Sequence, residues 1–280
     1  MREIPFTKMH GLGNDFVVID GRESSFGLDS RLISMIADRH YGIGCDQLVQ
    51  LELPADKEAD VFMRIFNADG SESEACGNAT RCVAASIMAK KEKKMVAIET
   101  IAGVLYAVRE GPRLISVDMG KVRLNWDEIP LVRKMNTLNL KINVKPLAGP
   151  TAVNIGNPHA VFFVPNLDKV PLEDCGRKVE NHPFYPQRTN VEVVQVLARN
   201  RIRVKVWERG VGITKASGSC AAAALVAAHL RGLTNRKAKV VLDGGSLKVE
   251  WKSNGHVIQT GPHAEVFSGN LCLKNFQGIR

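Results

Sequence analysis

The chain of 280 residues is long enough for two core-forming domains or one large one, and its 45% hydrophobic and 24% charged residues are ordinary for a globular protein. The longest apolar run, Cys220 to Ala228, is far shorter than the roughly 20 residues that cross a membrane. The first residues lack the apolar core of a signal peptide, so we expect a cytoplasmic protein with no membrane partner. The net charge of +9 is scattered along the chain, which disfavours nucleic-acid binding and fits either an anionic small molecule or a lysine-rich surface.

The six cysteines show none of the close pairs that are typical of a zinc site. A disulfide framework is also not expected in a chain of this size without an export signal. The cysteine pattern therefore predicts neither a metal nor a disulfide scaffold.

The first half of the chain alternates strands with two helices. Residues 1–20 are predicted to form a strand, a turn and a strand, with polar side chains at the turn. A short amphipathic helix follows at 30–39, and a second helix opens at Cys76 and continues to about Ala89. Further strands are predicted at 48–51, 61–66, 96–100, 104–109 and 114–119.

The second half begins with residues 121–150, whose prolines and mixed polarity are typical of a crossing between domains. An alanine-rich helix is predicted from Ser217 to about Leu230. Strands are predicted at 152–155, 160–164, 191–197, 202–207, 247–251 and 257–259, and near Val240 and Val266.

Cys76 is the residue with the clearest chemical potential. It stands directly before a helix, where the unpaired N–H groups and the positive end of the helix dipole favour an anion. A thiolate is favoured at such a position, and it can act as a nucleophile or a base near neutral pH. The alternative is a buried cysteine at a helix cap, and the local motif does not decide between the two.

The second half of the chain repeats the spacing of the first. Asn67 stands as far before Cys76 as Glu208 stands before Ser217. Each first member follows an apolar strand that ends in an aromatic residue, and each second member precedes a glycine and an alanine-rich helix. The repeat predicts two copies of one α+β unit.

The loops upstream repeat in the same way. Asn14 and Gln47 in the first half are separated by as many residues as Asn157 and Asn190 in the second. Two such units facing each other would place two helix N-termini, which bind carboxylates, and two sets of amide side chains around one cleft. This symmetry suits the inversion of a stereocentre, in which one group removes a proton and its counterpart delivers one.

At these residues the sequence resembles the diaminopimelate epimerase family of pyridoxal-independent epimerases. The resemblance extends in order over nearly the whole chain. The matching runs are Lys8–Phe16, Asp38–Gln47, Phe66–Ser71, Cys76–Asn78, Gly156–Val161, Asn190–Glu192, Trp207–Gly212 and Thr260–Pro262.

The resemblance implies an α+β fold of two pseudo-symmetric domains, each a curved, mostly antiparallel sheet around a central helix. The expected halves are residues 1–120, with 263–280 returning to them, and 121–262. The implied assembly is a homodimer with Phe267 at the contact. The implied reaction is the epimerisation of LL-diaminopimelate to meso-diaminopimelate without a cofactor, in lysine and peptidoglycan precursor biosynthesis.

The resemblance also implies the roles of individual residues. Cys76 would be one catalytic acid/base, and His159 and Glu208 would tune the two bases. The diamino dicarboxylic acid substrate would be held by side chains or backbone groups of Asn14, Gln47, Asn67, Gly77, Asn78, Asn157, Asn190, Glu208, Arg209, Gly218 and Ser219.

Ser217 departs from the family pattern, because it occupies the position of the second catalytic cysteine. A hydroxyl is a much weaker acid than a thiol, so its match to an α-proton is poor. Three readings stay open from the sequence: an epimerase, a one-base lyase or dehydratase on the same scaffold, and an amino-acid binder with impaired turnover. Cys220 lies one helical turn further on, and the sequence leaves open whether its thiol replaces the missing one.

Overall fold

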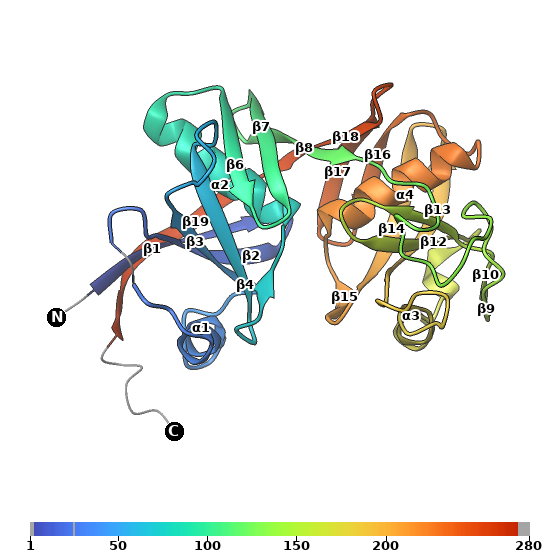
Figure 1. The fold of residues 1–280 in the computed structure, drawn as a ribbon, viewed down its shortest axis with the longest axis horizontal. Helices are drawn as coiled ribbons and strands as arrows, with labels where there is room; N and C mark the ends of the chain where they lie inside the picture. The colour runs from blue at the N-terminus through green and yellow to red at the C-terminus, as the bar shows by residue number, and fades with distance from the viewer. Residues whose placement is uncertain (1–2, 25, 274–280) are drawn as a thin grey trace. The chain divides into compact units, whose positions relative to one another are not determined.

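The computed structural model describes residues 3–24 and 26–273. The chain divides into two compact units, the first formed by Met1–Val117 together with Pro262–Arg280 and the second by Asp118–Gly261. Figure 1 shows both units as sheet-dominated α+β structures with few helices. The C-terminal strand β19 (Ala264–Cys272) pairs with β1 (Glu3–Gly11), which explains why the last residues belong to the first unit.

The sheet of the first unit is mostly antiparallel and runs in the order β19-β1-β2-β3-β4-β6-β7-β8. Only the pairs β2–β3 and β4–β6 are parallel, and each is joined by a connection that contains a helix. The two helices are α1 (Ser30–Ala37) and α2 (Gly77–Lys91). The strands are β2 (Asn14–Asp20), β3 (Gln47–Glu52), β4 (Val61–Asn67), β5 (Glu72–Ser73), β6 (Met95–Thr100), β7 (Gly103–Gly111) and β8 (Leu114–Lys121).

The second unit repeats this pairing scheme strand by strand. Its order is β11-β12-β13-β14-β16-β17-β18, in which only the pairs β12–β13 and β14–β16 are parallel. Helices α3 (Leu172–Glu180) and α4 (Gly218–Leu230) occupy the two parallel connections. The strands are β11 (Thr151–Asn154), β12 (Pro158–Phe163), β13 (Asn190–Ala198), β14 (Arg201–Glu208), β15 (Gly212–Thr214), β16 (Lys237–Leu242), β17 (Gly245–Trp251) and β18 (His256–Pro262). The repeat found in the sequence is thus a repeat of topology.

Each central helix packs against its sheet with most of its residues buried. Helix α2 packs against β1, β2, β6 and β7, and α4 packs against β11, β12, β13, β14, β16 and β17. Every residue of α4 from Cys220 to Ala228 is buried. Small alanine side chains let the strands approach the helix closely, and a helix without a polar face is stable only inside such a core. Both central helices were predicted, and their N-caps are Cys76 and Ser217.

One prediction from the sequence was wrong, and one helix was missed. Residues 121–150 are not a simple crossing, because Ile129, Leu140 and Leu147 are buried in the core of the second unit. Helix α3 was not predicted, because the amphipathic run of 9 residues before the proline-rich loop is short.

The described part of the chain contains no helix that is both long and apolar enough to cross a membrane.

Candidate active site

The first half of the candidate site gathers at one edge of the first sheet. Parallel strands β2 and β3 begin at Asn14 and Gln47, and antiparallel β4 ends at Asn67 beside Gln47. The amide of Gln47 donates to Asn67 Oδ1 at 3.0 Å. Strand pairing therefore brings together amide side chains that are far apart in the sequence, as the sequence predicted from the matching loops.

Cys76 lies at this edge as the N-cap of α2, with an extended backbone and a half-buried side chain. Its Sγ is 3.8 Å from Asn14 Oδ1, which also accepts a hydrogen bond of 3.0 Å from the Asn78 amide. The Asn14 amide in turn donates to Asp46 Oδ2 at 3.0 Å. These bonds hold the thiol in one place above the start of the helix.

A buried guanidinium lies behind this thiol, and the sequence analysis did not give it a role. Arg81 is fully buried in α2 and donates to Asn78 Oδ1 at 2.5 Å and to the Gly77 carbonyl at 3.3 Å. Burial lowers the pKa of Arg81, and the Coulombic interactions with Cys82 and Cys76 raise it. A cation in this position favours the Cys76 thiolate. The sequence did contain a signal for this role, because Arg81 is a lone charge within a helix of small residues of the kind that is buried.

The second half of the candidate site forms at the matching edge of the second sheet. Ser217 is the N-cap of α4 and is buried, and its Oγ is 3.5 Å from Ser219 Oγ. A Cβ at Gly218 would lie 2.6 Å from Gln259 Oε1, so a larger residue here would force the buried Gln259 side chain to move. The backbone N–H groups at the start of both central helices have the orientation that binds a carboxylate.

Glu208, the last residue of β14, is held next to Ser217. Its Oε1 accepts a hydrogen bond of 2.5 Å from Thr214 Oγ1. Burial raises the pKa of Glu208, while the hydroxyls of Thr214 and Ser217 and His159 lower it and the charge of Glu192 raises it further. The net direction is upward, so this carboxyl keeps its proton to a higher pH than an ordinary glutamate.

His159 is completely buried and is held from both sides. Its Nδ1 lies 2.7 Å from Glu192 Oε1, and its Nε2 lies 2.7 Å from Asn157 Oδ1. Glu192 was missed as a functional residue, although a lone acid in the apolar strand Val191–Leu197 was the signal. His159 and Glu192 thus form a buried, hydrogen-bonded pair within the second unit.

Two predicted substrate residues make mainly internal contacts. Asn190 is buried, its amide donates to the Pro158 carbonyl at 3.1 Å, and its Oδ1 accepts from the Arg209 backbone N–H at 2.9 Å. The Arg209 guanidinium donates to the Gln187 carbonyl at 3.2 Å. These bonds position the loop after β14.

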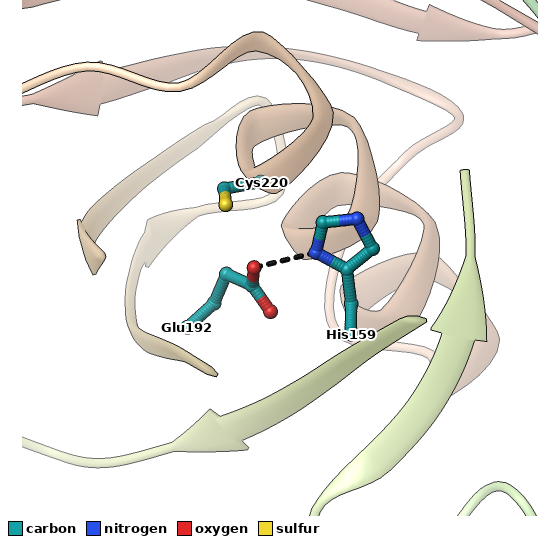
Figure 2. Close-up of side chains that lie close together, drawn as sticks. All are labelled: His159, Glu192 and Cys220. Atoms are coloured by element: carbon teal, nitrogen blue, oxygen red, sulfur yellow. Dashed lines mark hydrogen bonds and ion pairs between the residues drawn. The ribbon is translucent and has the colours of Figure 1, made fainter. Parts of the chain in front are cut away.

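Cys220 lies in the interior together with His159 and Glu192. Figure 2 shows its sulfur on the side of the Glu192 carboxylate. The thiol is 0% exposed, and burial together with Glu192 and Glu208 raises its pKa well above the ordinary value. A thiolate at this position is therefore disfavoured.

These three side chains are also the described group whose donor types could hold a metal ion, since their ligand atoms lie within 4.8 Å of one another. Imidazole, carboxylate and thiolate together are ligands that zinc prefers. Both ring nitrogens of His159 are, however, already in hydrogen bonds of 2.7 Å, and the thiol holds its proton. The contacts describe a hydrogen-bonded cluster.

Known structures share this fold over nearly the full chain. A hydroxyproline epimerase from Agrobacterium vitis, solved with bound trans-4-hydroxy-L-proline, superposes with a TM-score of 0.73 at 16% identity and covers 100% of this chain and 94% of that one. A PhzF-family phenazine biosynthesis protein from Bacillus anthracis has a TM-score of 0.68 at 15% identity, with 97% and 100% coverage. At this identity the likeness defines the class of fold, the two-domain fold shared by these proteins.

The sequence comparisons define the family within that fold. The diaminopimelate epimerase family model matches residues 6–125 and 151–266. Diaminopimelate epimerases from Rhodospirillum centenum and Acidiphilium cryptum are 51% and 49% identical, each over 95% of this chain and over 91% and 96% of their own length. The chain belongs to the diaminopimelate epimerase family.

Proposed function

We propose that this protein is an isomerase that interconverts LL- and meso-diaminopimelate by moving a proton at the α-carbon, without a cofactor. The family match over most of the chain supports this reaction, which belongs to lysine and peptidoglycan precursor biosynthesis. The observation that carries the proposal is the Cys76 half-site, where Asn14 holds the thiol at the helix start and the Arg81 guanidinium lies behind it. A thiol at a helix start with a cation nearby has its thiolate favoured, which suits the role of a base.

The proposal assigns the remaining residues by chemistry. The backbone N–H groups of Gly77 and Asn78, and of Gly218 and Ser219, would hold the carboxylate next to the reacting carbon, because helix N-termini bind anions. Half-buried polar groups would hold the rest of the substrate, with amides for its carboxylate and Glu208 for its amine. The amides proposed for this role are those of Asn14, Gln47, Asn67 and Asn157.

We also propose that the protein works as a homodimer through the face of β19. Val266 and Phe267 are 57% and 48% exposed on this strand, and Phe267 stacks edge-to-face on Phe6 with the ring centroids 5.9 Å apart. Exposed apolar side chains on one strand fit burial in a subunit contact. Analytical ultracentrifugation of the wild type and of Phe267→Asp tests this, and a wild-type monomer would contradict it.

The proposed reaction is tested by α-proton exchange in deuterated water, starting separately from LL- and meso-diaminopimelate. We expect deuterium incorporation with interconversion from both. Exchange from one diastereomer without inversion would identify a one-base enzyme. Stabilisation of the protein by the substrate without any exchange would identify a binder, and either result would overturn the proposal.

A further inference from the structure

The turn after strand β14 carries a cation that has no acidic partner in the described chain. Arg209 is half-buried and donates to the Gln187 carbonyl at 3.2 Å, and it forms no ion pair with any residue of the described ranges. A guanidinium binds a carboxylate through two parallel hydrogen bonds. In the proposed reaction the molecule that brings a carboxylate is the substrate, so the position of this turn matters for binding.

Strand pairing holds Glu208 but ends before Arg209. Glu208 is the last residue of β14 and pairs with Gly212 of β15. Arg209 and Gly210 lie beyond this ladder, in a turn closed by the hydrogen bond from the Val211 N–H to the Glu208 carbonyl. Gly210 has a φ of +77°, which such a turn needs at its third residue. The place of Arg209 therefore depends on residues outside the hairpin.

Glu180, the last residue of α3, holds this turn on both sides of Arg209. Glu180 is 5% exposed, its Oε2 accepts from the Trp207 indole N–H at 2.7 Å, and its Oε1 accepts from the Gly210 backbone N–H at 2.8 Å. The Arg209 N–H between them donates to Asn190 Oδ1 at 2.9 Å. One carboxylate thus makes two of the three bonds that hold this part of the chain.

The surroundings of Glu180 keep its carboxylate in this position. Helix α3 lies close to the indole ring, because a Cβ at Gly176 would lie 2.6 Å from Trp207 Cγ. The exposed guanidinium of Arg188 lies 3.3 Å from Glu180 Oε1 and supplies the counter-charge that a buried carboxylate needs. Because Arg188 fills this role, Arg209 is not drawn into an ion pair with Glu180 and stays available to an anion.

The first unit lacks both members of this arrangement. Ala68 is at the position of the repeat that matches Arg209, and α1 ends at Ala37, which matches Glu180. The two units share one topology, so the topology itself does not require an acid at the end of this helix. The acid and the arginine occur together in the second unit only, which supports a link between Glu180 and the Arg209 turn.

We propose that Glu180 is a positioning residue for substrate binding, whose carboxylate holds Trp207 and Gly210 so that the Arg209 guanidinium keeps one place for a carboxylate of the substrate. This inference rests on the function proposed above. A carboxylate that takes no part in the proton transfer is bound alike before and during the reaction, so Glu180 should act on affinity more than on the rate of the chemical step.

The first test is Glu180→Gln in the full-length protein. The amide keeps the size and one acceptor oxygen, but its NH2 group then faces the second N–H donor, so one of the two bonds is lost. We expect KM for LL-diaminopimelate to rise about tenfold, with kcat within about threefold of the wild type. Asp168→Asn is the matched control, because Asp168 pairs with Arg203 and Lys205 earlier on β14, and it should leave both constants unchanged.

A second substitution separates positioning from a loss of stability. Trp207→Phe removes the indole N–H, so the one acceptor oxygen left by Glu180→Gln can bond the Gly210 N–H without a competing donor. Phe66 is the residue at the matching position of the first unit. We expect KM of the double variant to return to within about threefold of Trp207→Phe alone. A merely structural role predicts the opposite, because two substitutions in one core lower stability further and restore nothing.

Arg188→Met tests the same arrangement from the surface, where a folding defect is not expected. Glu180 then lacks its counter-charge and should attract the Arg209 guanidinium away from the substrate, so KM should again rise severalfold while kcat changes little. Adding Glu180→Gln to Arg188→Met removes the attracting charge, and this pair should bind the substrate no more weakly than Glu180→Gln alone. An unchanged KM in Arg188→Met would contradict the proposal.

The outcomes distinguish this inference from the proposed function. A wild type that does not interconvert the diastereomers overturns the proposed function itself. An active wild type whose KM changes less than about twofold in Glu180→Gln overturns the role of Glu180 alone. A fall in kcat without a rise in KM, or a double variant with Trp207→Phe that binds no better than Glu180→Gln, would also overturn it.

Discussion

The two half-sites share one backbone plan but have opposite electrostatics. Both caps open an equivalent helix at the edge of an equivalent sheet. The buried Arg81 acts on Cys76, whereas the matching position of α4 is Ala222, and the second half-site contains the acids Glu208 and Glu192. The first environment favours a deprotonated group and the second a protonated one. Symmetry of the fold therefore does not require symmetry of the chemistry.

The largest effect should come from Cys76→Ser, which gives the first half-site a hydroxyl, with Asn67 at the position that matches Glu208. Without a thiol, α-proton exchange from both diastereomers should fall about 10²–10⁴-fold. Mass spectrometry of the substrate in deuterated water measures this. Cys272→Ala, at a half-exposed cysteine of β19, is the control and should exchange like the wild type.

Removing the cation should weaken the first half-site less. Arg81→Met leaves Cys76 without its buried positive charge, so the thiol should ionise at higher pH and react about tenfold more slowly with iodoacetamide at pH 7, which corresponds to about one pKa unit. Arg81→Lys retains a cation and should stay closer to the wild type. Identical alkylation profiles for all three proteins would contradict the assigned role of Arg81.

Neutralising Glu192 should change the pH dependence of the activity without abolishing the activity. Glu192 raises the pKa of Glu208, so Glu192→Gln should lower that pKa. Activity that needs protonated Glu208 should then be lost at lower pH than in the wild type, because a group with a lower pKa gives up its proton earlier as the pH rises. The kcat/KM profile measures the shift, and a limb that moves upward would refute the sign.

The smallest catalytic effect is expected for Cys220→Ala. The thiol is buried and kept protonated, so interconversion should remain within about twofold of the wild type. Loss of the buried sulfur should still destabilise the fold by about 1 kcal/mol, as measured by urea unfolding. An activity loss as large as that of Cys76→Ser would instead indicate that the Cys220 thiol is the second acid/base.

The repeat, both central helices and the convergence of Asn14, Gln47 and Asn67 were predictable, because periodic apolar runs and equal spacings define strands that end at one edge. Helix α3 and the packing of residues 121–150 were not, because short amphipathic and proline-rich segments are structured mainly by what they contact. Arg81 and Glu192 were recognisable in the sequence as lone charges within runs of small or apolar residues. The sequence did not show which residues they contact.

The sequence by itself determined the family, the two-fold repeat and the two helix caps, Cys76 and Ser217. Only the tertiary structure decided what surrounds each cap. The guanidinium behind Cys76 lies on its own helix, but the carboxyl beside Ser217 comes from β14, and Cys220 turns toward Glu192 on β13. Acidity depends on burial and on charges within a few ångströms, and these distances exist only once the strands have closed around the helix.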